Sequence, residues 1–135
     1  MVVWDYHVIL VHASAESTQV YDLDTTLSFP ASFQDYCEST FGSEDQLKEC
    51  YHRKFRVVPA ERYLATFASD RRHMKNSEGE WLQPPPPWSC IKIETTVHNL
   101  ESFIDMTEGL GEGGVFSLVD FIRTIQTKRG DLLEK

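Results

Sequence analysis

The chain has 135 residues and a formal net charge of -8 at pH 7, with 41% hydrophobic and 25% charged residues. This composition is that of an ordinary soluble globular protein, and the length predicts a single domain, residues 1–135, with a modest core. The acidic charge argues against nucleic acids and anionic membranes as partners, and no apolar run approaches the roughly 20 residues that cross a bilayer.

Two strand-like runs, residues 4–12 and 19–24, stand on either side of a short polar link at residues 14–18. Their β-branched and aromatic content, with polar residues at the borders, predicts a β-hairpin. Ionisable side chains occupy positions where a sheet would normally have Val or Ile: His7 in the first run, and Asp22 and Asp24 in the second.

The register of this hairpin decides which carboxylate meets the imidazole. A turn centred between Ala15 and Glu16 puts His7 opposite Asp24, and a turn one residue earlier puts it opposite Asp22. Both carboxylates share one face of their strand, so either can reach His7. An Asp bonded to one ring nitrogen fixes the tautomer and leaves the other nitrogen for proton transfer. The pattern indicates two thirds of a catalytic triad or, alternatively, a polar cross-strand pair on a solvated face.

The middle of the chain predicts helices and one strand. Pro30 and Gly42 bound a segment with helical spacing, whose apolar positions are Phe33, Tyr36, Cys37 and Phe41. A capping box over residues 43–46 begins a short helix that reaches about residue 50. Alternation over 54–58 predicts a strand, and 60–68 predicts a helix with Tyr63, Leu64 and Phe67 on one side.

Four consecutive prolines, Pro84 to Pro87, predict a stiff polyproline II segment. It fits an exposed ligand for SH3- or WW-type domains. It also fits a strap packed on its own domain by Trp81 and Trp88, and the tryptophans on both sides favour this second interpretation.

The last third predicts a short strand at 90–93, a brief helix at 100–106, a glycine-rich turn at 109–114 and a C-terminal helix. Ser117 caps this last helix and Gly130 ends it. The order of elements predicts a mixed α+β fold, with a largely antiparallel sheet and packed helices.

The strings Trp-Asp-Tyr-His-Val at 4–8 and Tyr-Asp-Leu-Asp at 21–24 resemble the signature of the protein N-terminal glutamine amidohydrolase family. Further stretches are similar in the same order, at residues 53–57, 67–71, 73–75 and 84–87. The resemblance covers most of the chain and weakens after about Glu94.

This resemblance implies a fold related to papain and transglutaminases, and a monomeric enzyme that needs no metal or organic cofactor. Its reaction converts the N-terminal Gln of proteins or peptides to Glu through a Cys-His-Asp triad, in which His7 and Asp22 take the last two places. In the family the product feeds an arginylation-dependent degradation pathway. Because the sequence has no basic region followed by an apolar stretch at its start, we expect a cytoplasmic and nuclear protein.

The family's nucleophilic cysteine lies upstream of the WDYHV strand, and this sequence opens directly on that strand. We therefore expect a shortened form that lacks the attacking thiol and is inactive alone. Cys37, Cys50 and Cys90 show neither disulfide nor zinc spacing, and each is interpreted as a small buried apolar residue. Cys90 is the least unsuitable substitute, since a nucleophile must lie within hydrogen-bonding reach of its base.

Capture of a free α-ammonium group favours a carboxylate, and Asp24 and Asp70 are the candidates. Asp70 fits equally well as a helix-end residue paired with Arg71 or Arg72. A zinc site is not expected, because the odd spacing of His7 and His12 sends the two side chains to opposite faces of a strand. Trp4, Tyr6 and Tyr21 are interpreted as core residues.

Two other classes of function remain open. The chain fits a non-catalytic form that binds peptides with N-terminal Gln or occupies a partner of the full-length enzyme. It also fits a shortened product without a stable fold, because losing a packed element can cost more than the ~5–15 kcal/mol of a domain's stability.

Overall fold

The computed structural model describes residues 5–133, with side chains described through residue 128. The chain folds into two compact units. Within the described residues, unit 1 runs to Lys54 and resumes at Phe116, and unit 2 is Phe55–Val115. Two small sheets and four α-helices lie in the described part of the chain, which confirms the α+β class. The relation to papain and the single domain over 1–135 stay predictions.

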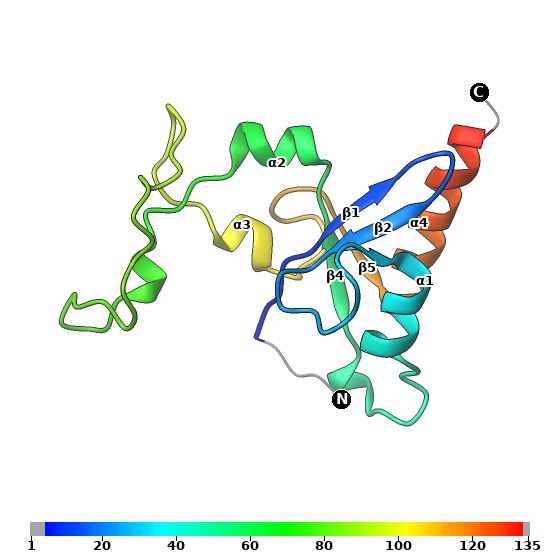
Figure 1. Ribbon diagram of the computed structural model, residues 1–135. Helices are drawn as coiled ribbons and strands as arrows, with labels where there is room; N and C mark the ends of the chain where they lie inside the picture. Colours follow the sequence, from blue (N-terminus) through cyan, green and yellow to red (C-terminus); the bar gives the residue numbers. More distant parts are fainter. Residues whose placement is uncertain (1–4, 134–135) are drawn as a thin grey trace. The chain divides into compact units, whose positions relative to one another are not determined.

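The predicted hairpin forms the first sheet of unit 1 (Figure 1). Strands β1 (Leu10–Ala13), β2 (Thr18–Tyr21) and β3 (Ala31–Ser32) are antiparallel, in the order β1-β2-β3. Leu10 pairs with Tyr21 and Ala13 with Thr18, so the turn is centred between residues 15 and 16. The first of the two predicted registers is therefore the one adopted.

The two faces of the first run differ in burial. His7, Ile9, Val11 and Ala13 are half-buried, on the face where Val20, opposite Val11, is 0% exposed. On the other face Tyr6 is 43% and Val8 is 68% exposed, so the prediction that Tyr6 belongs to the core is wrong. Tyr21 is half-buried, with Phe29 edge-on to its ring, and Trp4 lies outside the described residues.

Helix α1 (Phe33–Tyr36) follows β3 and continues as one wide turn, η1 (Cys37–Phe41). It begins at Phe33 rather than at the predicted Pro30, because Ser32 is its cap and accepts a hydrogen bond from the Asp35 amide at 3.0 Å. Gly42 ends the segment as predicted, with φ of 59°.

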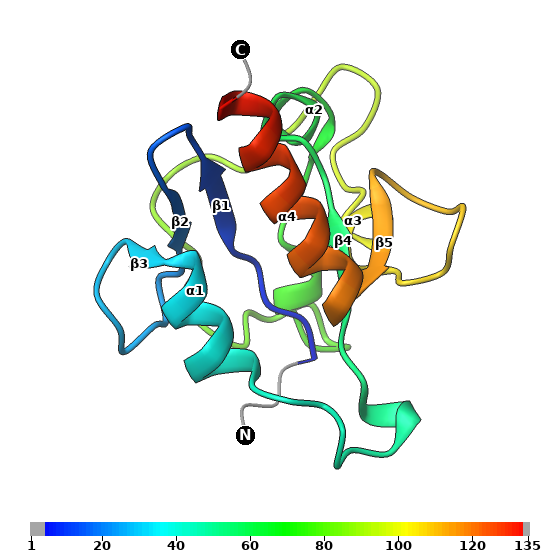
Figure 2. The same ribbon diagram turned by 90° about the vertical axis from the view of Figure 1, so that its right-hand side faces the viewer.

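Helix α4 (Leu118–Leu133) lies beside β1 (Figure 2). The Ser117 hydroxyl accepts a hydrogen bond from the Asp120 amide, which confirms the predicted cap. The predicted end at Gly130 is wrong, because the helix continues to Leu133; a glycine inside a helix costs only about 1 kcal/mol. Edge-on aromatic rings join α4 to the α1–η1 segment and form the core of unit 1: Phe33 with Phe121, Phe41 with Phe121, and Tyr36 with Phe41.

The helix predicted from the capping box at 43–46 does not form; only a short 3-10 turn, η2 (Glu49–Tyr51), is present there. The Ser43 hydroxyl accepts from the Asp45 amide, and the Glu44 carboxylate turns to Arg53. Glu44 accepts from both the backbone amide and the guanidinium of Arg53, at 2.8 and 3.1 Å. The Ser43 hydroxyl thus bonds the Asp45 amide, whereas the predicted capping box needs it at the amide of Gln46.

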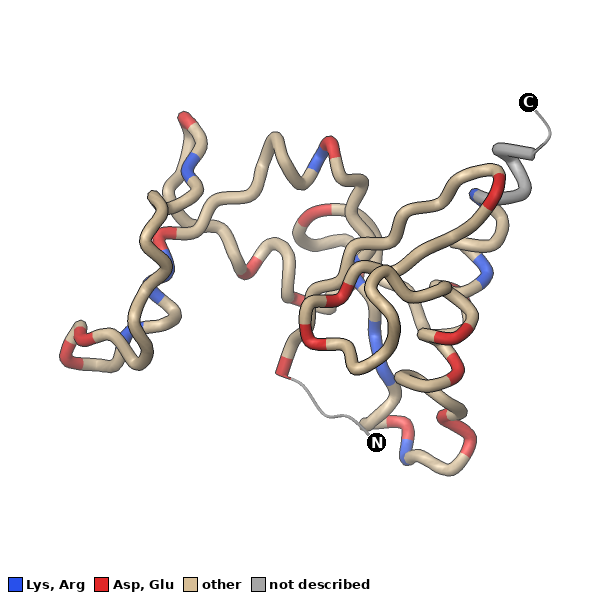
Figure 3. The backbone as a smooth tube through the Cα atoms, in the orientation of Figure 1, with Lys and Arg blue, Asp and Glu red and all other residues tan. Residues whose placement is uncertain are grey.

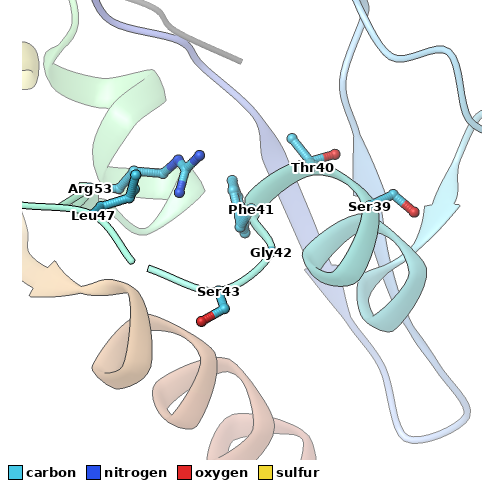
Figure 4. Close-up of a pocket in the computed structure, with 7 residues that line it drawn as sticks. All are labelled: Ser39, Thr40, Phe41, Gly42, Ser43, Leu47 and Arg53. Atoms are coloured by element: carbon cyan, nitrogen blue, oxygen red, sulfur yellow. The ribbon is translucent and has the colours of Figure 1, made fainter. Parts of the chain in front are cut away.

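A depression of about 270 Å³ lies beside this pair in unit 1 (Figure 4). Its lining residues are Ser39, Thr40, Phe41, Gly42, Ser43, Leu47 and Arg53. The guanidinium of Arg53 lies 6.0 Å from the centre of the Phe41 ring. Because Glu44 already pairs with this guanidinium, the positive charge of Arg53 is neutralised at the depression.

Between residues 54 and 117, the predicted strand and helices form, at shorter lengths. Strand β4 (Lys54–Val57) pairs with β5 (Gly114–Ser117), and α2 (Ala60–Thr66) and α3 (Glu101–Ile104) follow, with a short turn η3 (Arg72–Met74). The Tyr63 and Phe67 rings stack at 4.8 Å, and Phe103 of α3 meets both edge-on. Leu64 is 78% exposed, so its predicted place beside Tyr63 is wrong. The predicted strand at 90–93 is reduced to isolated bridges at Ile91 and Ile93.

The proline segment is held on unit 2 by an arginine. The guanidinium of Arg71 donates to the carbonyl oxygens of Pro86, Trp88 and Ser89 at 3.0–3.3 Å. Trp88 is 67% exposed, and Trp81 is 39% exposed beneath the ammonium of Lys75. Pro84, Pro85 and Pro87 are exposed as well, so the prediction of a strap packed by Trp81 and Trp88 is wrong. The segment is held by the hydrogen bonds from Arg71 instead.

A second arginine ties the glycine-rich segment to β4. The guanidinium of Arg56 donates to the carbonyl oxygens of Asp105 and Glu112, and Arg62 pairs with the Glu112 carboxylate at 2.7 Å. Gly113 has φ of 69°, and a Cβ there would meet the carbonyl oxygen of Val57 at less than any real contact distance. The close approach of this segment to β4 therefore requires glycine at 113.

We predict that Gly113→Ala destabilises the protein more than Gly109→Ala. Both glycines have positive φ, so each alanine costs about 1–2 kcal/mol for its backbone conformation. Only the Cβ at 113 meets backbone, whereas the one at 109 meets nothing within 4 Å, so Gly113→Ala is expected to cost a further ~1–3 kcal/mol. Urea unfolding of both variants measures the difference, and equal losses would contradict the close approach.

Candidate active site

The hairpin brings His7 and Asp22 together in unit 1. His7 precedes β1, and Asp22 directly follows β2. The Nε2 atom of His7 lies 2.9 Å from Oδ1 of Asp22, and the two side chains are 15% and 4% exposed. Strand pairing ends at Tyr21, and a turn begins at Asp22. In this turn the Asp22 carboxylate lies against the imidazole of His7. The register alone would have placed Asp24 opposite His7.

Asp22 is a buried carboxylate surrounded by donors. The hydroxyl of Tyr36 donates to Oδ2 at 2.6 Å, and the backbone amide of Asp24 donates to Oδ1 at 2.9 Å. Burial favours the neutral acid and would raise the pKa of Asp22, but the hydrogen bonds from Tyr36 and the Asp24 amide, together with the adjacent imidazole of His7, outweigh it and hold the pKa below its usual value. Asp22 is therefore ionised at neutral pH.

Asp24 lies on the other side of the imidazole. Its Oδ2 atom is 3.9 Å from Nδ1 of His7, and its side chain is 78% exposed. Because Asp22 occupies the Nε2 side, proton exchange with a reacting group falls to Nδ1. Asp24 thus places a second negative charge at the reactive edge of the ring, on the solvent side.

The three side chains also meet a distance criterion for metal ligands. His7, Asp22 and Asp24 offer atoms that all lie within 4.8 Å of one another. However, the two carboxylates meet different ring nitrogens, and Asp22 is already engaged by Tyr36 and the Asp24 amide. The side chain of His12 lies on the exposed face of the run, away from the face that carries His7, as the odd spacing of the two residues predicts. The arrangement suits acid–base chemistry better than metal binding.

The second candidate carboxylate, Asp70, lies in unit 2 and has other partners. It accepts from the guanidinium and the amide of Arg72, and Nδ1 of His98 lies 3.2 Å away. The hydrogen bond from Arg72 holds the pKa of Asp70 well below its usual value. Of the two predicted partners, Arg72 is the one that pairs, while Arg71 binds the proline segment. A role for Asp70 in substrate binding stays a prediction.

The cysteines differ from their predicted burial. Cys37 is half-buried, and burial together with the charge of Glu38 raises the pKa of its thiol to about 11, so it is a weak nucleophile at neutral pH. Cys50 and Cys90 are exposed, so the expectation that they are buried apolar residues is wrong. Among the described residues, the cluster of His7 with its two carboxylates, in which all the ligand atoms lie within 4.8 Å of one another, includes no cysteine.

Tyr36 is the site residue that sequence reasoning missed. Its helical spacing assigned Tyr36 to the apolar face of a helix. This assignment is correct for the ring and gives no information about the hydroxyl. The available signal was that a Tyr, and not a Phe, occupies a core position, because a buried phenol needs a hydrogen-bond partner. Nothing in the spacing identifies that partner as Asp22, 14 residues earlier.

Comparison with known proteins shows the family of this chain. The model of the N-terminal glutamine amidase family matches residues 1–125. The chain belongs to this family. The match extends well beyond Glu94, where the resemblance was expected to weaken.

Relatives named protein N-terminal glutamine amidohydrolase are similar over most of the chain. The protein of Danio rerio is 48% identical over 128 residues, which are 94% of this chain and 63% of the relative. The protein of Homo sapiens is 46% identical, over 94% of this chain and 62% of its own length. That of Drosophila ananassae is 47% identical over 90% of this chain and 60% of its own. The chain thus spans about three fifths of the length of these family members.

We predict that the Asp22 carboxylate stabilises the fold in a pH-dependent way. Because its folded pKa lies below the unfolded value of about 3.9, its contribution is complete above about pH 5 and disappears as the pH falls through the folded pKa. Asp22→Asn is expected to lower the free energy of unfolding at neutral pH by about 1–3 kcal/mol, and by less at acidic pH.

Chemical unfolding between about pH 3 and pH 7 measures this difference. Asp35→Asn, at an exposed position in α1, corrects for the loss of one negative charge. An Asp22→Asn deficit that grows toward acidic pH would contradict the ionised state of Asp22.

Proposed function

We propose that the protein hydrolyses the side-chain amide of an N-terminal glutamine, giving glutamate and ammonia. The observation that carries this proposal is the buried His7–Asp22 pair on the WDYHV strand, in a chain of the N-terminal glutamine amidase family. The pair is an oriented imidazole backed by an ionised carboxylate, which is the acid–base half of a hydrolytic triad.

The proposed reaction begins with a thiolate, which attacks the carboxamide carbon of the glutamine side chain. The carbonyl oxygen becomes an oxyanion, and the intermediate collapses with loss of ammonia after His7 protonates the nitrogen. Water, deprotonated by His7, then attacks the resulting thioester, releasing the carboxylic acid and regenerating the thiol. Asp22 orients the imidazole and stabilises its positive charge throughout.

We further propose that the attacking thiol comes from residues outside the 135 of this sequence. In support, the high pKa of Cys37 makes it a poor nucleophile, and the cluster of mutually close side chains formed by His7, Asp22 and Asp24 among the described residues includes no cysteine. Under this proposal the present chain supplies the base and its orienting carboxylate, and is inactive alone.

The substrate proposal is a protein or peptide with a free N-terminal Gln. Asp24 is the stronger of the two candidates for the α-ammonium group, because its exposed carboxylate lies beside the reactive nitrogen of His7. We also propose that the enzyme acts as a monomer without metal or organic cofactor in the cytoplasm and nucleus, and that its product enters an arginylation-dependent degradation pathway.

Ammonia release tests the proposed activity. The substrate is a Gln-initiated peptide, and a peptide with only internal Gln is the control. Two proteins are compared: this chain, and this chain preceded by the corresponding upstream segment of the Danio rerio relative. We expect release only from the extended protein and only with N-terminal Gln. His7→Ala should abolish it, and Asp22→Asn should lower it by orders of magnitude, ~10⁴ in the serine-protease example.

Asp35→Asn is the matched control and should retain activity. Release from the 135-residue chain would contradict the external thiol, and Cys90→Ser would then be the next variant. Full activity of His7→Ala would contradict the assignment of the base.

We predict a separate effect for Asp24. If its carboxylate binds the α-ammonium group, Asp24→Asn raises KM for the Gln-initiated peptide about tenfold, the effect of about 1.4 kcal/mol, while kcat changes little. Asp70→Asn is the comparison, because its carboxylate is already paired with Arg72. A fall in kcat without a change in KM would instead assign Asp24 to the chemistry.

A further inference from the structure

We propose that Tyr36 is a positioning residue of this site: its hydroxyl fixes the Asp22 carboxylate so that one carboxylate oxygen faces His7. This inference rests on the proposed function. It concerns how the orienting carboxylate is itself oriented, and none of the motifs in the sequence identifies this residue.

The geometry divides the two oxygens of Asp22 between different tasks. Oδ2 accepts the Tyr36 hydroxyl at 2.6 Å, a short bond of the kind made to ionised acceptors. Oδ1 accepts the Asp24 amide at 2.9 Å and faces Nε2 of His7 at 2.9 Å. With one oxygen anchored, rotation of the carboxylate about its Cβ–Cγ bond is blocked, and the other oxygen stays on the imidazole.

The phenol is also fixed at its own end. Tyr36 is the last residue of α1, whose first turn is capped by Ser32, and it is 1% exposed. Its ring meets Phe41 edge-on at 5.4 Å. A tyrosine held in this way cannot follow Asp22 into another rotamer, so the position of α1 is transmitted to the carboxylate.

The protonation states support this role. Burial, the hydrogen bond to Asp22 and the charge of Asp22 all raise the pKa of Tyr36, so the phenol remains a donor throughout the working pH range. The bond from Tyr36 is in turn the largest of the interactions that lower the pKa of Asp22. Loss of the hydroxyl would leave Oδ2 in a buried place without that donor.

If Tyr36 only filled space in the core, replacing it with phenylalanine would leave the pKa of Asp22 unchanged. Phenylalanine fills nearly the same volume and keeps the edge-on contact with Phe41, so Tyr36→Phe removes the hydroxyl and preserves the packing. Tyr63→Phe is the matched control, because Tyr63 is half-buried between aromatic rings and the pKa of its phenol is raised by burial alone. Both variants lose one phenolic hydroxyl, but only Tyr36 donates to a carboxylate.

The first measurement needs no catalysis. The side-chain carboxyl carbon of Asp22 is titrated by NMR in this chain; the titratable groups that face it are His7, Asp24 and Tyr36. We expect Tyr36→Phe to raise the apparent pKa of Asp22 and Tyr63→Phe to leave it unchanged. An unchanged Asp22 titration in folded Tyr36→Phe would overturn the proposal, whether or not the protein is an amidohydrolase.

The second measurement uses ammonia release by the extended protein. Tyr36→Phe is expected to lower kcat about tenfold or more with KM unchanged, since it removes one hydrogen bond to a charged group that orients the base. Because Asp22 would then protonate more easily, the acid limb of the kcat profile should move to higher pH. If no protein releases ammonia, the proposed function fails while the titration still decides the role of Tyr36.

Should Tyr36→Phe fail to fold, the unmodified chain decides the question. The hydroxyl proton of Tyr36 is sought in the proton NMR spectrum, coupled through space to Asp22. A downfield resonance in slow exchange with water supports the anchored carboxylate, and a rapidly exchanging hydroxyl overturns it.

Discussion

The buried, ionised carboxylate of Asp22 is the constraint on which the rest of the site depends. A carboxylate whose side chain is only 4% exposed is costly unless several donors compensate for the lost water. Here they come from three parts of unit 1: His7 from the run before β1, the amide of Asp24 from the turn after β2, and Tyr36 from α1. The hairpin, the turn and the helix must all be in place before the imidazole is oriented.

This arrangement explains why a short chain can carry a defined acid–base pair. His7, Asp22 and the donors named above for Asp22 all belong to unit 1, so the pair is assembled within one compact unit. Acidic residues recur along the whole described chain (Figure 3), so the negative charge near His7 is not itself distinctive. What distinguishes Asp22 is burial with partners, whereas Asp24 and Asp70 keep solvent access or pair with arginine.

Sequence reasoning succeeded where the signal was local or periodic. Strand alternation predicted the hairpin and both possible registers, and capping predicted the start of α4 at Ser117. It failed where other contacts decided the outcome: the Ser43 hydroxyl bonds the Asp45 amide and caps no helix, and Arg71 holds the proline segment in place of the tryptophans. The choice of Asp22 over Asp24 came from the family resemblance, because both carboxylates lie on the same face of a strand and the alternation of side chains cannot separate them. Tyr36 was missed because its ring fits the apolar face of a helix, and this spacing gives no information about the partner of its hydroxyl.

The most direct test of the account is the tautomer of His7, read from the nitrogen NMR shifts of its imidazole above the pH at which it takes a second proton. The account predicts a neutral ring with its proton on Nε2, facing Asp22, and Nδ1 left for proton exchange. In Asp22→Asn this preference should weaken. A proton found on Nδ1 in the unmodified protein would contradict the account, because Asp22 would then not be the group that orients the base.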